Sequence, residues 1–566
     1  MVKGYLLSAF SANRDIFHNH GKLIVSHGGG RGSETLNNKT LQKGPVLASD
    51  QLAEDKSVRA LLRTMELKRP LALLIDDKYS LFPYDLHSRG CAYAVLGFYR
   101  IAHAWGTCFS RLNTLSLGLR TSFCLAEKQN ASGSNGQVVR YKFAFQWCQE
   151  QGDPWWWNEP GTTASHDAAV VPLLENIIAP PTPPSPTSIP GPDPTCQSCG
   201  GASPQVYSEG WMCLKPNCPA FFTLDGHAPP VSLSYANTFV QPVPFAQLDL
   251  GDIRPPQPTS HPQDGLLTTR HSCRGWHCRK CGRFSSRFKW ENWECRNCGN
   301  VAEVHGDHRI AAEFRHQVQG EHFIQHRHAA RSGIIKSNTQ MYNYGRGFST
   351  FVTFTLPHSR GKIHVIFSSP FANRTADGIL GMYQDEAVKG KLRFRRWPLR
   401  SHKCRGTLLT NYFSQNTGEE YHYVAGTENT VPWEKAPGAV IAARALINER
   451  MKQALGLDYE FNEVLSAGYM EKQKMAFHSD AERGLGTTVA SLSLGASAYM
   501  HFRLHAQFTK ELPEDCSREV LSLYLRHGDV VVMEGADIQK YYEHTVVPLN
   551  FRIAATARYI DSSNHQ

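Results

Sequence analysis

Short apolar runs of strand length recur along the chain and predict a β-rich protein with few helices. Near the N-terminus, three runs have this character: 69–77 (RPLALLIDD), 91–105 (CAYAVLGFYRIAHAW) and 138–148 (VVRYKFAFQWC). Residues 55–67 (DKSVRALLRTMEL) instead predict a short helix. We therefore expect a mixed, β-rich domain over residues 1–175, whose role the pattern leaves open.

After residue 304, strand-like runs alternate with one clear helix. Residues 347–356 (GFSTFVTFTL) and 362–368 (KIHVIFS) predict strands, and 436–455 (APGAVIAARALINERMKQAL) predicts a helix with Pro437 near its start. Beyond residue 458 the pattern gives only short strands and turns. This favours a β-sandwich or a jelly roll (a double-stranded β-helix) within a multidomain α+β protein.

Proline-rich stretches divide the chain, because such segments favour extended conformations and cannot bury a core. The first is 176–195 and the second lies within 227–270. The predicted order of segments is an N-terminal domain (1–175), a linker (176–195), a first zinc-ribbon-like module (196–226), a linker (227–270), a second such module (271–303) and a C-terminal domain (304–566, core about 458–562).

An excess of basic over acidic residues makes a negatively charged partner more plausible. The 566 residues include 60 Lys and Arg against 50 Asp and Glu, a net charge of +10. This excess suits a polyanion such as nucleic acid, although a mildly basic soluble protein fits equally well. No apolar run reaches membrane-spanning length, and the first residues lack the pattern of a secretory signal. We expect a nuclear or cytoplasmic protein without membrane partners, and the oligomeric state stays open.

Eight of the fifteen cysteines form two clusters with metal-binding spacing. Zn²⁺ prefers a tetrahedron of soft ligands, and two turns that each carry a cysteine pair supply one. Four cysteines leave no position for water, so both zinc ions would be structural. Unmetallated thiols are the alternative. The expected ligands are Cys196, Cys199, Cys213 and Cys218 in the first module, and Cys278, Cys281, Cys295 and Cys298 in the second.

The second module is rich in basic and aromatic residues. Basic side chains can contact phosphates and rings can stack on bases, so nucleic-acid contact is one interpretation. Rings that pack the small ribbon core beneath a solvated basic face are the other. The residues concerned are Arg279, Lys280, Arg283, Arg287, Lys289 and Arg296, with Phe284, Phe288, Trp290 and Trp293.

Three residues near the C-terminus have the types that hold non-haem iron. His478 and Asp480 are two apart, so a strand would point both side chains to one face, and His544 lies downstream. Two imidazoles and one carboxylate on one face leave positions open for a 2-oxo acid and O2. The H-x-D pair alone is common by chance, and only the residues downstream of it make the pattern specific.

Two arginines come after His544 at an even spacing. Arg552 and Arg558 are six apart, so a strand would place both on one face with Cα atoms roughly 20 Å apart. Their forked side chains suit the carboxylates of a small dicarboxylate. Two surface arginines on an edge strand are the alternative, but the residues between them are small or apolar, as in a buried strand.

Together these positions resemble the AlkB family of iron(II)- and 2-oxoglutarate-dependent dioxygenases. The resemblance covers about residues 461–560 and, more loosely, the chain from about 340. It implies that His478, Asp480 and His544 bind iron(II), that Tyr469 and Arg552 hold the distal carboxylate of 2-oxoglutarate, and that Arg558 positions it near the metal. It also implies that Glu482 contacts the target base. Tyr412 and Phe413 are candidates for a lid over that base, or equally for core.

The chain departs from the family pattern at two positions. Asparagine is usual two residues before the tyrosine, where Ala467 stands, and some members carry another two residues after the first arginine, where Ala554 stands. One lost hydrogen bond to a charged group costs roughly 1.5–3 kcal/mol. We expect weaker binding of 2-oxoglutarate rather than an inactive homologue.

The resemblance implies oxidative demethylation or dealkylation of nucleic-acid bases, as in DNA repair, with iron(II), 2-oxoglutarate and O2 as the reacting groups and two structural zinc ions. DNA is the favoured substrate. Two alternatives stay open. One is the same chemistry on RNA or protein, and the other is a catalytically weak nucleic-acid-binding scaffold built on the zinc ribbons.

Overall fold

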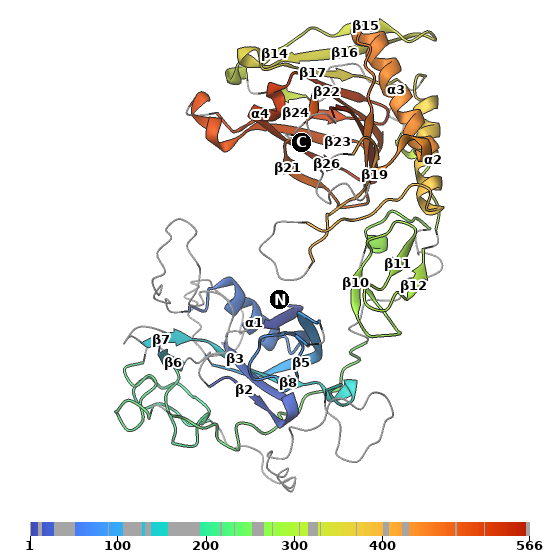
Figure 1. Cartoon of the computed structure of the whole chain (residues 1–566). Coiled ribbons are helices and arrows are strands. Elements are labelled where there is room, and N and C mark those ends of the chain that lie inside the picture. The colour runs from blue at the N-terminus through green and yellow to red at the C-terminus, as the bar shows by residue number, and fades with distance from the viewer. Residues whose placement is uncertain are drawn as a thin grey trace. The chain divides into compact units, whose positions relative to one another are not determined.

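In the computed structural model the chain forms two compact units, Met1–Ile253 and Arg254–Gln566 (Figure 1). Each is described by itself. The structure describes residues 2–8, 14–27, 51–88, 90–105, 127–130, 137–156, 193–215, 218–230, 232–251, 265–273, 275–304, 306–314, 326–328, 330–369, 371–399, 407–420, 430–480, 484–513 and 516–561. Most of the predicted linker 176–195 lies outside these residues. Within them, no helix is long and apolar enough to cross a membrane.

A six-stranded sheet forms the centre of the first unit. Its strands, in spatial order, are β1 (Gly4–Leu7), β4 (Leu71–Asp76), β5 (Tyr93–Trp105), β8 (Lys142–Trp147), β3 (Leu23–His27) and β2 (Ile16–His18). Helix α1 (Lys56–Glu66) buries Val58, Leu61 and Leu62 in the same core as this sheet. Strands β6 (Glu127–Asn130) and β7 (Gln137–Arg140) pair separately. The three apolar runs and the helix predicted here are therefore present.

The first cysteine module packs onto this unit. Cys196, Cys213 and Cys218 share a buried cluster with Val25 of β3 and Trp105 of β5. The segment 227–270 was expected to be a linker, and this is wrong for part of it. Leu233, Ala236 and Phe239 are buried in the same cluster, because their apolar side chains cover the module.

Two sheets face each other in the second unit, consistent with the predicted jelly roll. The larger, in spatial order, contains β14 (Ile335–Lys336), β16 (Phe348–Thr355), β17 (Lys362–Ile366), β25 (Val530–Glu534), β22 (Leu485–Gly495), β27 (Arg552–Ile560), β20 (Glu463–Tyr469), β18 (Phe413–Gly418) and β19 (Thr430–Val431), with β15 (Gln340–Asn343) paired to β16. The smaller contains β13 (Arg327–His328), β24 (Glu519–Leu525), β23 (Ala498–Leu504), β26 (Tyr542–Pro548) and β21 (Met475–His478).

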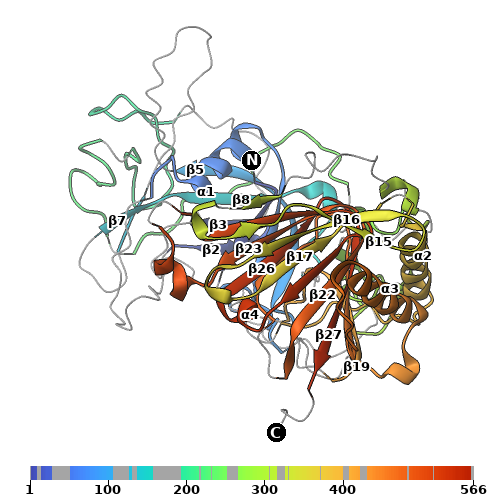
Figure 2. The ribbon, with the colours of Figure 1, turned by 90° about the horizontal axis from the view of Figure 1, so that it is seen from above.

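One core lies between the two sheets and another lies outside the larger one. Val365 of β17 and Val531 of β25 meet Phe502 of β23 and Leu523 of β24 in the first. Helices α2 (Arg374–Val388) and α3 (Gly438–Leu455) cover the other face of the larger sheet and lie side by side (Figures 1 and 2). The helices thus brace the sheet from outside and leave its inner face to the smaller sheet.

The expectation of a single clear helix after residue 304 is wrong, because α2 precedes α3. Gly378 and Gly381 interrupt its sequence and lower its intrinsic helix propensity. Tertiary packing compensates, because Ile379, Leu380 and Tyr383 recur at helical spacing and are buried against the sheet and α3.

The second cysteine module is part of the second unit's own core rather than a separate body. Its strands are β9 (Gly275–His277), β10 (Phe284–Ser286), β11 (Asn292–Glu294) and β12 (Val301–Glu303). Trp290 packs against Phe394, Phe413 and Phe551 in the core outside the larger sheet. Glu291 accepts two hydrogen bonds from Arg395, at 2.6 and 2.7 Å. The module is therefore held firmly on the unit.

Candidate active site

The two histidines of the predicted metal triad lie directly opposite each other on paired strands. His478 ends β21 and faces His544 of β26. The sequence suggested that strand alternation places Asp480 on the same face as His478. This is not so, because Asp480 lies two residues beyond the end of β21. Its backbone N–H instead donates to the Gln539 side chain, at 3.0 Å, from helix α4 (Asp537–Tyr541).

The three side chains converge on one point. Asp480 Oδ1 is 4.0 Å from His478 Nε2, and its Oδ2 is 3.9 Å from His544 Nε2. One ligand atom from each residue lies within 4.8 Å of the others. This spacing fits one shared ion, and two imidazoles with one carboxylate are the donor set that non-haem iron(II) prefers.

The protonation states also suit a metal. His478 Nδ1 lies 2.9 Å from the carbonyl oxygen of Ala476 and donates to it, so Nε2 is the ring nitrogen on the side of Asp480. Burial, followed by the neighbouring His478, lowers the pKa of His544 to about 3, which leaves a neutral imidazole at neutral pH. Burial alone would raise the pKa of Asp480, but His544 and Arg558 hold it below its usual range.

Beside the triad, three neighbouring strands present a floor of small residues between two arginines. Pairing of β20, β27 and β22 sets Tyr469, Arg552 and Gly495 side by side at one end. At the other end, Glu463, Arg558 and Val489 are side by side. Between the ends, the same face carries Ala467, Ala554, Ser493, Leu465, Thr556 and Ser491. Between the two arginines this face therefore carries mostly small side chains.

Arg552 is a buried cation without a paired anion among the described residues. Its Nη2 donates to Ser493 Oγ at 2.9 Å, and its guanidinium carbon is 5.8 Å from the ring centre of Tyr469. Within the described part of the chain, its Nε and Nη1 have no hydrogen-bond partner, and no carboxylate pairs with it. Burial lowers its pKa. An uncompensated buried charge is costly, so this site fits a ligand carboxylate.

Arg558 has a different environment. Its Nε and Nη2 donate to the two carboxylate oxygens of Glu463, at 2.6 and 2.8 Å, and both residues are fully buried. Its Nη1 is 3.8 Å from Asp480 Oδ1. Most of its hydrogen-bonding fork is thus used by Glu463, and its remaining side faces the metal triad.

The two predicted substrate residues that the structure describes fall in different places. Tyr412 is buried with its ring centre 5.6 Å from that of Tyr469, so it lies at the Arg552 end of the floor. Phe413 is fully buried and packs on Trp290, so of its two expected roles, lid or core, the structure shows the core. Its side chain points to the outer core because neighbours in a strand alternate between faces. Glu482 lies outside the described residues.

Sequence reasoning missed Glu463 and Ser493. Glu463 precedes Tyr469 by six residues, and Arg558 comes after Arg552 by the same interval. In an antiparallel pair, placing Tyr469 opposite Arg552 requires Glu463 to lie opposite Arg558. That equal spacing was a usable signal for Glu463. Ser493 had none, because it comes from a third strand whose register depends on the whole sheet.

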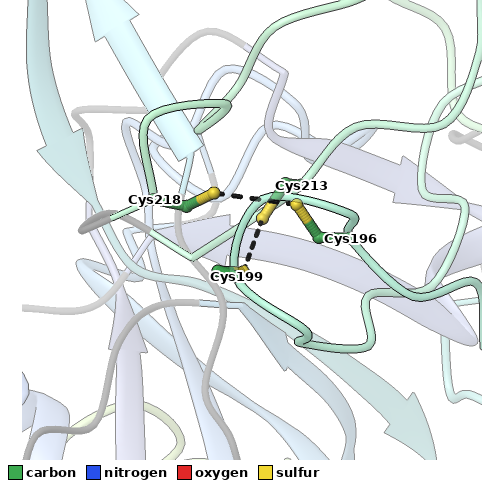
Figure 3. Close-up of side chains that lie close together, drawn as sticks. All are labelled: Cys196, Cys199, Cys213 and Cys218. Atoms are coloured by element: carbon green, nitrogen blue, oxygen red, sulfur yellow. Dashed lines mark hydrogen bonds between the residues drawn. The ribbon is translucent and has the colours of Figure 1, made fainter.

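The two cysteine clusters have the arrangement of four-sulfur metal sites. In the first, Cys196 and Cys218 sulfurs are 3.7 Å apart and those of Cys199 and Cys213 are 3.8 Å apart, with the four thiols gathered at one point (Figure 3). In the second, the corresponding distances are 3.6 Å for Cys278 and Cys298 and 3.5 Å for Cys281 and Cys295. Such spacings fit the edges of a tetrahedron around zinc.

Comparison with protein families supports this geometry. Residues 384–557 match the family model of the 2OG-Fe(II) oxygenase superfamily, a stretch that includes the triad, Tyr469 and Arg552. Among solved structures, one described as "The structure of OsALKBH1" matches with 16% identity and a TM-score of 0.23, over 35% of this chain and 97% of that chain. No curated protein matches the sequence.

Proposed function

Because residues 384–557 match the 2OG-Fe(II) oxygenase superfamily, we propose that the chain is an iron(II)- and 2-oxoglutarate-dependent demethylase of nucleic-acid bases. DNA is the proposed substrate ahead of RNA, and repair of alkylated bases is the proposed role. The proposal includes a nuclear or cytoplasmic location, where thiols stay reduced and can bind zinc.

The unpaired guanidinium of Arg552 is the observation that carries this proposal. A protein that only binds nucleic acid would gain nothing from a buried cation with two free N–H groups, whereas a dicarboxylate co-substrate supplies the missing anion. The Tyr469 ring beside it and the mostly small residues of the floor suit a slender ligand. The family match adds the identity of that ligand, 2-oxoglutarate.

Each residue of the site then has a part in the reaction. His478, Asp480 and His544 would hold iron(II), Arg552 and Tyr469 would bind the distal carboxylate of 2-oxoglutarate, and Arg558 would fix the Asp480 carboxylate. When bound, iron(II) supplies an oxidation in which 2-oxoglutarate and O2 become succinate and CO2 while one oxygen atom enters an N-methyl group, which then leaves as formaldehyde.

The protein's own contribution is orientation and the exclusion of water. Asp480 and His544 are buried, and the carbonyl of Ala476 fixes the orientation of the His478 ring. Arg552 is held by Ser493 at one point only, so its other N–H groups stay available for the co-substrate. The net charge of +10 and the basic second module support a polyanionic substrate.

The direct test is turnover on matched DNA and RNA oligonucleotides that carry the same methylated bases. We expect formaldehyde and succinate in equal amounts, with DNA faster than RNA, and neither product from a His478→Ala variant. Equal or faster turnover of RNA would reverse the proposed order of substrates. Succinate without formaldehyde on every methylated oligonucleotide, but with turnover of a methylated protein, would overturn the nucleic-acid assignment.

A further inference from the structure

Basic residues concentrate in the two turns that carry the zinc ligands of the second module. Arg279 and Lys280 lie between Cys278 and Cys281, and Arg296 lies between Cys295 and Cys298. All three are exposed. Because the four cysteine sulfurs gather at one point, the two turns are neighbours, and all three cations lie on these turns. We call these three residues the knuckle cations.

Three other basic residues described in the module, Arg283, Arg287 and Lys289, have structural partners. Arg287 is fully buried and donates to the carbonyl oxygens of Leu267 and Ser272. Lys289 pairs with Glu294, and the Arg283 guanidinium donates to Asn297 Oδ1 at 3.1 Å. Within the described residues, no carboxylate pairs with a knuckle cation, since Glu291 is engaged by Arg395 and Glu294 by Lys289.

Holding zinc does not require these charges. Charge balance is the alternative explanation: four thiolates outweigh the charge of one Zn²⁺, and basic neighbours would offset the excess negative charge. The first module is an internal comparison, because it has the same sulfur arrangement. Its two turns contain Gln197 and Ser198 on one side and a single basic residue, Lys215, on the other. The additional cations of the second module therefore need another explanation.

Aromatic rings accompany the knuckle cations. Phe284 comes after the first turn, on β10, and is 43% exposed, with one side of its ring near His277 at 5.1 Å between ring centres. Phe288 is half-buried, and the Arg296 guanidinium carbon lies 5.6 Å from its ring centre. Cations for phosphates beside rings for bases are the combination that binds single-stranded nucleic acid without reading its sequence.

We propose that the knuckle cations of the second module bind the phosphodiester backbone of single-stranded nucleic acid, with Phe284 as a stacking surface for a base. Trp290 and the Glu291–Arg395 pair fix the module on the oxygenase core, so a strand bound there is held at a constant position relative to the metal triad. Binding of the strand does not depend on the proposed function. Only the further step, that the bound strand is the substrate of the oxygenase, rests on it.

The test measures binding to unmodified single-stranded DNA and RNA of one sequence, by fluorescence anisotropy over a range of salt concentrations. The variant combines Arg279→Gln, Lys280→Gln and Arg296→Gln. The matched control combines Arg374→Gln, Lys389→Gln and Lys435→Gln, three exposed cations on the helical side of the same unit. Zinc content and thermal unfolding are measured for both, so that loss of the module is recognised.

Each lost phosphate contact reduces the slope of log K against log salt by about 0.7 for single strands. We expect the knuckle variant to lose about 2 from this slope and to bind about 100-fold more weakly near 0.1 M salt. The control should bind like the wild type, and both should keep their zinc. Phe284→Ala should weaken binding without changing the slope.

An unchanged slope and affinity in the zinc-loaded knuckle variant would overturn the inference and assign these cations to charge balance around the thiolates. DNA and RNA arms show which polymer is held. The result is independent of the demethylase assignment, because binding of unmodified strands needs no turnover. Loss of binding together with the absence of any demethylation would uphold this inference while the proposed function fails.

Discussion

Glu463 and Arg558 face each other on neighbouring strands and join through two hydrogen bonds, at 2.6 and 2.8 Å, with both side chains fully buried. The pair lies on the larger sheet next to the metal triad, because Arg558 Nη1 is 3.8 Å from Asp480 Oδ1. Arg558 is therefore not simply available for 2-oxoglutarate, as the resemblance alone would suggest. Its hydrogen-bonded partner is Glu463, and it acts on Asp480 through charge across 3.8 Å rather than through a hydrogen bond.

Removing one member of this pair should be more damaging than removing both. Glu463→Gln leaves the Arg558 charge buried without its anion and should lower the free energy of unfolding by about 3–5 kcal/mol. Glu463→Gln combined with Arg558→Met should lose less stability than Glu463→Gln alone, and so less than the sum of the single changes. Urea unfolding of the four proteins measures this coupling. Strict additivity would show that the two side chains do not depend on each other.

Replacing Arg552, unlike replacing Glu463, should not reduce the stability of the protein. Arg552→Met removes an unpaired buried charge, so the protein without co-substrate should be as stable as the wild type or more so. Affinity for 2-oxoglutarate should fall about 100-fold, since two hydrogen bonds to a carboxylate contribute about 3 kcal/mol together. Anaerobic titration with iron(II) and 2-oxoglutarate, alongside thermal unfolding, measures both quantities.

Arg450 is the matched control for that substitution. It is also a buried arginine, but its N–H groups donate to the carbonyl oxygens of Gly528 and Ala372. Arg450→Met should destabilise the protein because it leaves these carbonyls unsatisfied. A loss of stability in Arg552→Met similar to that in Arg450→Met would mean that Arg552 is structural and needs no ligand anion.

Local sequence patterns predicted the parts of this site that lie within one segment. The even spacing of Arg552 and Arg558 placed both on one face, and the cysteine spacings predicted two clusters. Asp480 was harder, because its position depends on a contact with α4 rather than on strand alternation. Ser493 and the outward direction of Phe413 depend on the register of the whole sheet, which no short motif encodes.

The two alanine departures can also be tested, because the structure makes them neighbours. Ala467 and Ala554 are directly paired across β20 and β27, in the middle of the floor. Ala467→Asn would add an amide that can donate to the co-substrate, so we expect about tenfold tighter binding of 2-oxoglutarate, from roughly 1.5 kcal/mol. Ala467→Leu, which adds similar bulk without a donor, should bind it more weakly than the wild type. Equal weakening by both variants would show that only volume matters here.

Zinc loss from the two modules should have different consequences. The second module contributes Trp290 to the oxygenase core, and a Cβ added at Gly468 would lie 3.2 Å from that ring. Because Gly468 precedes Tyr469, disordering the module should disturb the co-substrate end of the floor. Cys278→Ser with Cys281→Ser should therefore lower both the unfolding temperature of this unit and its affinity for 2-oxoglutarate.

The matched change in the first module is Cys196→Ser with Cys199→Ser. These cysteines belong to a module that packs on the first unit, so 2-oxoglutarate affinity should stay at the wild-type value while the first unit loses stability. Calorimetry and anaerobic titration separate the two effects. Equal loss of 2-oxoglutarate binding from both double variants would mean that zinc supports the chain as a whole, and that Trp290 has no special link to Tyr469.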